Sequence, residues 1–250
     1  MKDGTWKTYD KQGKVRQTEI YKEDLKEGKW VNNTKDASSG VHLIETEFYR
    51  NDKPTGTWKK ETEEGRLLWE KEYKNPENYI HREYHTNGKL STEEFYKDNR
   101  LDGTAKYYNS SSILISERKY SEGYLTAEVS YYENGNKKEV VSSKEGYKHG
   151  LYQEFSENGQ LEVEGQFAMG YKSGEWKYYD EDMLEETFTY TDGHKNGISK
   201  TYNEAGNVES EGNYSNDEKT GIWKHYKLNG KLLREIEYKN DEVVSEKKYN

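Results

Sequence analysis

A phrase of 18 residues recurs through the chain and limits the architectures that it can form. The copy that starts at Gly221 reads GIWKHYKLNGKLLREIEY. Related phrases start at Gly4, Gly56, Gly103, Gly150, Gly174 and Gly197. The aromatic residue at the sixth position recurs every 24, 24, 23, 24, 23 and 24 residues, at Tyr84, Tyr108, Tyr132, Phe155, Tyr179, Tyr202 and Tyr226. A constant period of this length predicts a repeat protein in which each unit packs against its neighbours.

Composition alone would indicate disorder, because only 30% of the residues are hydrophobic and 35% are charged. The chain nevertheless has 24 Tyr, 6 Trp and 5 Phe, and they fall in register with the repeat. Each unit can therefore bury one or two large rings. The sequence predicts a folded protein with a shallow core.

Each repeat is predicted to be a β-hairpin, with positions counted from its glycine as position 1. Asn-Gly at positions 9 and 10 predicts a type I′ turn, which needs positive φ at both central residues. Opposed positions then sum to nineteen, so position 4 faces position 15. The residues at these positions have opposite charges, in the pairs Lys59–Glu70, Arg82–Glu93, Lys106–Glu117, Lys200–Glu211 and Lys224–Glu235. Such cross-strand pairs contribute roughly 0.2 to 1 kcal/mol each.

Side-chain alternation along the strands assigns the two faces of the sheet. Positions 3, 12 and 18 are predicted to share the buried side, which carries residues such as Trp223, Leu232 and Tyr238. Positions 4, 6, 13 and 15 are predicted to share the other side, so the sixth-position aromatics lie among the Lys–Glu pairs. A bulge at position 5 would reverse this assignment, and residues 106–108 and 177–179 are where we expect one.

The predicted fold is all-β, an elongated single-layer antiparallel meander of about ten tandem hairpins of 23–24 residues. The repeats form one continuous array over residues 4–244, and residues 245–250 form a partial terminal repeat. Two copies depart from the pattern. The copy that starts at Gly28 carries a four-residue insertion in the segment TKDASS. In the other copy Lys137 and Ser143 replace the usual Leu and Tyr, and we expect a local break in the core at that copy.

The pattern Gly-x-Trp-x-x-Tyr, Asn-Gly, Leu-x-x-Glu-x-x-Tyr resembles the variant MORN repeat (membrane occupation and recognition nexus, second type) of bacterial proteins of the YwqK antitoxin-like family. The resemblance covers nearly the whole chain. The resemblance implies that the chain is a toxin-neutralising protein, a surface or secreted protein, or a scaffold attached to other domains. The family's name also points to membrane or phosphoinositide recognition.

The net charge of -9 and the pI near 5.4 argue against nucleic acid and against an anionic membrane as partners. The chain has no run of eighteen apolar residues and no apolar leader after Met1. We therefore expect a cytoplasmic protein. The alternative is an exported protein whose leader has been removed, because the chain begins at the tail of a repeat.

No residue pattern indicates catalysis, a cofactor or a metal site, so the chain is not expected to be an enzyme. The six histidines occupy no recurring position and are expected at the surface. The acidic segment 180–186 lacks the ligand spacing of a dedicated calcium loop and is expected to be a solvated turn.

Two functions remain open at this stage. The first is a protein-binding module, in its concrete form an antitoxin or immunity-like protein, whose seven sixth-position aromatics bind a toxin or another complex subunit. The second is a structural rod or surface scaffold, in which the same rings only cover neighbouring lysine stems. Asn33 and Glu61 interrupt the row, so a partner is expected to bind the middle and C-terminal repeats.

Overall fold

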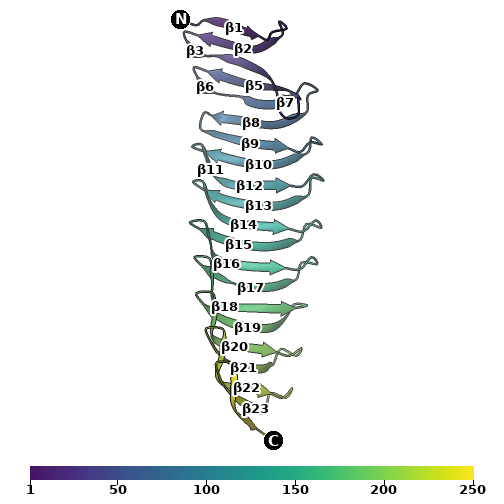
Figure 1. Cartoon of the computed structure of the whole chain (residues 1–250), viewed down its shortest axis with the longest axis vertical. Coiled ribbons are helices and arrows are strands. Elements are labelled where there is room, and N and C mark those ends of the chain that lie inside the picture. The colour runs from purple at the N-terminus through teal and green to yellow at the C-terminus, as the bar shows by residue number, and fades with distance from the viewer. The chain divides into compact units, whose positions relative to one another are not determined.

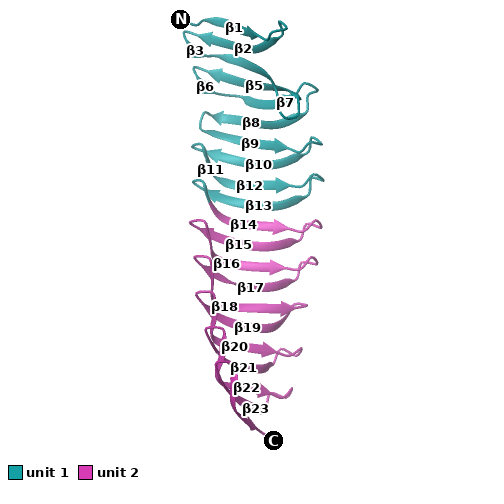
Figure 2. Ribbon diagram, in the orientation of Figure 1, with its two compact units in different colours: residues 1–124 teal, residues 125–250 magenta.

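The structure is a computed structural model that describes every residue from Met1 to Asn250. It contains 24 β-strands and no helix, which confirms the all-β prediction. Contacts divide the chain into two compact units, residues 1–124 and 125–250, coloured teal and magenta in Figure 2.

The first unit contains five hairpins, β1–β2, β4–β5, β7–β8, β9–β10 and β12–β13. Its strands are β1 (Gly4–Tyr9), β2 (Val15–Lys22), β3 (Leu25–Lys26), β4 (Gly28–Lys35), β5 (His42–Arg50), β6 (Lys53–Pro54), β7 (Thr57–Thr62), β8 (Leu67–Asn75), β9 (Asn78–Tyr84), β10 (Leu90–Lys97), β11 (Arg100–Leu101), β12 (Gly103–Tyr108) and β13 (Leu114–Ser121). The short strands β3, β6 and β11 continue into β4, β7 and β12 after a break in pairing.

The second unit contains five more hairpins, β14–β15, β16–β17, β18–β19, β20–β21 and β22–β23, followed by β24. Its strands are β14 (Tyr124–Tyr131), β15 (Lys137–Lys144), β16 (Tyr147–Phe155), β17 (Leu161–Ala168), β18 (Tyr171–Asp180), β19 (Met183–Thr191), β20 (His194–Tyr202), β21 (Val208–Ser215), β22 (Glu218–Tyr226), β23 (Leu232–Lys239) and β24 (Glu242–Lys248). Within each unit, neighbouring strands pair antiparallel in an open meander (Figure 1). The predicted tandem hairpins are confirmed.

The turns within hairpins differ from the prediction. In the Asn-Gly turns only the glycine has positive φ, 76° at Gly230 and 89° at Gly135. The N–H of Gly230 donates to the carbonyl of Lys227 over 2.8 Å, as in a type I turn followed by a left-handed glycine. The predicted type I′ turn is therefore wrong. Beside this turn the second strand has one more residue than the first. The longer turn accommodates this extra residue.

Type I′-like geometry occurs between hairpins instead. Asn216 and Asp217 join two hairpins and have φ values of 48° and 69°. The backbone N–H of Asp217 donates to the carbonyl of Lys195 over 2.9 Å, and its carboxylate accepts the Lys195 N–H over 2.7 Å. Asp241 repeats both bonds with Lys219, over 3.1 and 2.8 Å. These bonds tie successive turns together along one edge of the unit.

A bulge near position 5 corrects the predicted faces in part. Tyr226 pairs with Leu232 and His225 pairs with Arg234, so Leu233 at position 13 is the extra residue. The same shift occurs in most hairpins, including those with doubled tyrosines at 107–108 and 178–179. Directly paired residues share a face, so position 12 lies with the tyrosine of position 6. Its predicted place beside the tryptophans is wrong.

Positions 3 and 18 lie on one side as predicted, and we call this side the tryptophan face. In the second unit its core is Trp176, Phe188 and Tyr190, with Tyr152 and Phe167 packed against them. In the first unit it carries a continuous series of rings with centroids 4.6 to 5.4 Å apart, through Tyr21, Trp30, Tyr49, Trp58, Tyr73, Tyr79 and Tyr96. These ring contacts bury apolar surface although only 30% of the residues are hydrophobic.

The tryptophans also connect consecutive hairpins. The indole N–H of Trp176 donates to the carbonyl of Gln166 over 3.1 Å, and that of Trp223 donates to Asn213 over 3.2 Å. Each acceptor lies ten residues back, in the preceding hairpin. A lysine ammonium covers the outer side of each ring, with Lys172 Nζ 4.1 Å from the Trp176 centroid. A single-layer sheet thus buries its rings with its own long side chains.

The two irregular copies fall where the sequence places them. The insertion extends hairpin β4–β5, which pairs without a bulge as far as Lys35 and His42. In hairpin β14–β15, Glu128 pairs with Val141 on the tryptophan face, and Val141 is buried. The connected rings of the second unit begin only at Tyr152, in the next hairpin. This matches the expected local break in the aromatic core.

Candidate functional site

The side opposite the tryptophans, which we call the charged face, carries positions 4, 6, 12 and 15. The structure pairs all five predicted couples in register, including Lys59 with Glu70 and Lys224 with Glu235. The row also continues between hairpins, where Glu164 pairs with Lys177 and their charged atoms lie 3.1 Å apart. Alternating charges therefore run across the strands and fix their register.

Tyrosines at position 6 donate hydrogen bonds to glutamates of this row of charges. The hydroxyl of Tyr84 donates to Glu70 over 2.9 Å, that of Tyr226 to Glu211 over 2.7 Å, and that of Tyr179 to Glu164 over 3.0 Å. Each acceptor belongs to the preceding hairpin. These tyrosines are half-buried.

The bonded tyrosines predict a loss of stability at high pH. Burial, with the bond to Glu70, raises the pKa of Tyr84 from 10 to about 12. The bond to Glu211, with burial, raises the pKa of Tyr226 to about 12. Because the folded-state pKa values are raised, the stabilisation is complete below pH 10 and is lost as the pH rises towards 12.

Urea unfolding across this pH range, with tyrosinate absorbance recorded in parallel, measures the effect. A Tyr84→Phe/Tyr226→Phe variant should lose less stability than the parent between pH 10 and 12, because it lacks two of the titrating groups. Equal losses in the two proteins would contradict the assigned hydrogen bonds.

Six of the seven predicted site residues occupy equivalent places on the charged face. They are Tyr84, Tyr108, Phe155, Tyr179, Tyr202 and Tyr226, each paired with the aliphatic residue of position 12. No ring contact joins one of these six to another. These six rings therefore do not pack on one another, and their role in binding stays a prediction.

Tyr132 does not belong to this row. Its N–H bonds to the carbonyl of Asn136 inside the glycine turn, and Tyr131 pairs with Lys137 in the place that Tyr226 and Leu232 take elsewhere. The Tyr132 hydroxyl instead donates to the carbonyl of Phe155 over 2.8 Å. Two adjacent tyrosines and a repeat length that alternates between 23 and 24 left the sequence register open by one residue.

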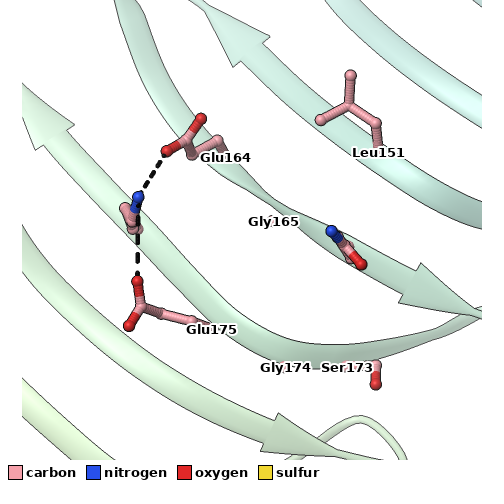
Figure 3. A pocket seen from close by; sticks show the side chains of 8 residues that line it. Leu151, Glu164, Gly165, Ser173, Gly174 and Glu175 are labelled. Carbon is pink, nitrogen blue, oxygen red and sulfur yellow. Dashed lines mark hydrogen bonds and ion pairs between the residues drawn. The ribbon is translucent and has the colours of Figure 1, made fainter.

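The charged face also exposes apolar side chains at position 2, which the sequence prediction missed. Ile198 and Ile222 are 56% and 55% exposed, and Leu151 occupies the same position two repeats earlier than Ile198. Leu151 borders a hollow of about 370 Å³ whose other walls include Glu164, Glu175 and Lys177 (Figure 3). The ammonium of Lys177 bridges the two carboxylates, at 3.1 and 3.9 Å. One lysine thus faces two glutamates at the edge of this hollow.

The expectation that all histidines lie at the surface is wrong for His81. Its side chain is 17% exposed, and its Nδ1 atom lies 3.6 Å from Glu94. The proximity of His81 lowers the pKa of Glu94 below the ordinary value. His81 occupies position 3, where other repeats carry tryptophan, so the repeat alignment already contained the signal for its burial.

Taken together, the hairpins define an open β-repeat protein with one aromatic face and one charged face. The MORN repeat variant family model matches residues 2–23, 80–98, 148–168, 195–216 and 219–240. Each matched segment covers one hairpin, so five of the hairpins match the MORN repeat variant. Repeats of this type usually mediate binding to a protein or a membrane.

Other comparisons add little. The search of curated proteins gave no match. Among solved structures, that of TcdB2-TccC3-TEV is 12% identical, with 96% of this chain and 20% of that chain covered and a TM-score of 0.19. That of TcdB2-TccC3-Cdc42 is 12% identical, with 92% and 16% covered and a TM-score of 0.17. The chain thus spans about a fifth of the first of these. The structure has no helix, and so none that could span a membrane.

Proposed function

We propose that the chain is a non-enzymatic protein-binding module whose charged face contacts a partner protein. The observation that carries the proposal is a series of exposed apolar side chains, those of Leu151, Ile198 and Ile222, which share that face with the half-buried tyrosines of position 6. Tyrosines offer large contact areas at small entropic cost, and uncovered apolar side chains favour a partner surface. The net charge of -9 favours a protein over an anionic membrane.

In its more specific form, the proposal is an antitoxin or immunity-like protein that neutralises a partner toxin. The support is the resemblance of the repeat to that of the antitoxin-like family. Affinity capture from the source organism, followed by mass spectrometry, tests it. A reproducible stoichiometric partner with toxin activity supports this form, and a stoichiometric partner of another kind supports only the general one. The absence of any stoichiometric partner would favour the rod or scaffold function.

Removing the sixth-position rings should weaken capture without unfolding the sheet. We expect a Tyr108→Ser/Tyr179→Ser/Tyr202→Ser variant to bind the captured partner at least tenfold more weakly, about 1.4 kcal/mol. Far-ultraviolet circular dichroism should remain that of a β-sheet, because the tryptophan face is untouched. Tyr132→Ser is the matched control, since this tyrosine lies in a turn outside the row. If the triple variant and the parent bind with equal affinity, the sixth-position aromatics are not part of the binding site.

A further inference from the structure

A groove of about 570 Å³ lies on the charged face at the glycine-turn ends of the last three hairpins. Its apolar lining comes from Met183 and Leu184 of β19, Tyr202 of β20 and Leu228 of the turn after β22. Leu228 is 83% exposed and Met183 is 43% exposed. Leu184 and Tyr202 are half-buried, so the four side chains form a partly exposed apolar strip.

Carboxylates surround this strip, and no lysine or arginine lines it. They belong to Asp180, Glu185, Glu204 and Glu209. All four are exposed, and none forms an ion pair within the chain. Elsewhere on the same face, Glu164 and Glu211 are paired with Lys177 and Lys200. The groove therefore combines apolar area with uncompensated negative charge.

Tyr202 adds an unused hydrogen-bonding group to the groove. Tyr179 and Tyr226 donate their hydroxyls to a glutamate 15 residues back. The residue in that place for Tyr202 is Thr187, which is buried opposite Lys200 and too short to reach the ring's hydroxyl. The Tyr202 hydroxyl has no hydrogen-bond partner in the chain. The row of glutamates is thus interrupted at the repeat that lines the groove.

We infer that this groove binds a basic amphipathic segment of a partner protein. Its apolar side chains pack on Leu184 and Leu228, and its lysine or arginine side chains pair with the surrounding carboxylates. Complementary charge increases the association rate and selects against acidic partners. A second copy of this chain, with its net charge of -9, is disfavoured for the same reason. The inference rests on the proposed function and names the chemistry of the partner.

A synthetic peptide of alternating lysine and leucine, labelled with a fluorophore, is the probe. Fluorescence anisotropy compares it with one peptide in which glutamate replaces lysine and another in which serine replaces leucine. We expect only the lysine–leucine peptide to bind, because the groove offers both negative charge and apolar area. Binding should weaken as salt screens the carboxylates.

Two variants test whether the peptide occupies this groove. Glu185→Gln/Glu204→Gln should weaken binding about tenfold, or 1.4 kcal/mol. The control, Glu157→Gln/Glu162→Gln, changes exposed glutamates at the same repeat positions in hairpin β16–β17 and should bind like the parent. Leu228→Ser removes only an exposed side chain and should also weaken binding.

Other outcomes would overturn the inference. Equal weakening in the two glutamine variants would indicate general attraction to an acidic surface. Concentration-dependent sedimentation that Leu228→Ser abolishes would place a second copy of the chain in the groove. If the peptide fails to bind while the captured partner still depends on the sixth-position tyrosines, this inference fails and the proposed function stands. If no partner is captured at all, the proposed function fails first.

Discussion

Trp176→Ala should lower the free energy of unfolding by about 3 to 5 kcal/mol, the range for removal of a large buried ring. Trp176 is 1% exposed, and its ring centroid lies 5.1 Å from that of Phe167 and 5.4 Å from that of Tyr152. The change also removes the indole bond to Gln166 and the surface on which Lys172 lies. Urea unfolding followed by circular dichroism measures the loss.

Trp6→Ala is the matched control, because Trp6 has the same repeat position but is 46% exposed. Its indole N–H donates to Asp3 in its own segment rather than to a preceding hairpin. The expected loss is about 1 kcal/mol, because the Trp6 ring buries less apolar surface area than the Trp176 ring. Hydrogen exchange should show that the Trp176 change exposes amides in β17 and β19, because each hairpin supports its neighbours. Equal losses for the two variants would contradict the assignment of the tryptophan face as the core.

Gly212→Ala should destabilise the protein by about 3 kcal/mol through steric overlap. A Cβ atom on Gly212 would lie 2.2 Å from Cδ2 of Trp223, and one on Gly165 would lie 2.3 Å from Cδ2 of Trp176. Both glycines have ordinary φ values, so the cost comes from the ring and not from the backbone. In the copy that has the small residue Ser199 at position 3, the facing residue of the preceding hairpin is the large Phe188. A small residue thus faces a large ring here too, with the two positions reversed.

A double-mutant cycle separates this overlap from other causes. In a Trp223→Leu background, Gly212→Ala should cost less than about 1 kcal/mol, because the smaller side chain leaves room for the methyl group. Gly206→Ala is a further control, since that glycine has a φ of 76° and no atom within 4 Å of its Cβ position. Its cost should be about 1 kcal/mol and should not depend on Trp223. A Gly212→Ala cost that is the same in both backgrounds would exclude the overlap.

The sequence predicted the part of the candidate site that depends on cross-strand register. The rule that opposed positions sum to nineteen correctly placed Lys224 opposite Glu235. It holds for this pair because the pairing depends on the number of residues between the two positions. The same count placed Tyr179 and Tyr202 on the charged face beside those pairs. It failed at Tyr132, where two adjacent tyrosines fit a repeat of 23 or 24 residues equally well and the turn hydrogen bonds decide.

The groove could not be predicted because its residues come from three hairpins. Met183 and Glu185 belong to one, Tyr202 and Glu204 to the next, and Leu228 to the third. Tyr202 belongs to the repeated pattern, but Met183 and Leu228 do not, so the period gives no reason to group these residues. Only the stacking of successive turns brings them to the same edge.

By itself, the sequence determined the repeat, the hairpins, the opposite charges across them and the aromatic side of positions 3 and 18. These features follow from periodicity and alternation, which act over a few residues along one strand. The tertiary structure alone decided the side of position 12, the type of each turn and the depth of each tryptophan. One extra residue at position 13 moves Leu232 to the charged face, and a glycine such as Gly212 in the preceding hairpin admits the ring of Trp223. Both depend on pairing and volume between strands, which the local pattern of one strand does not encode.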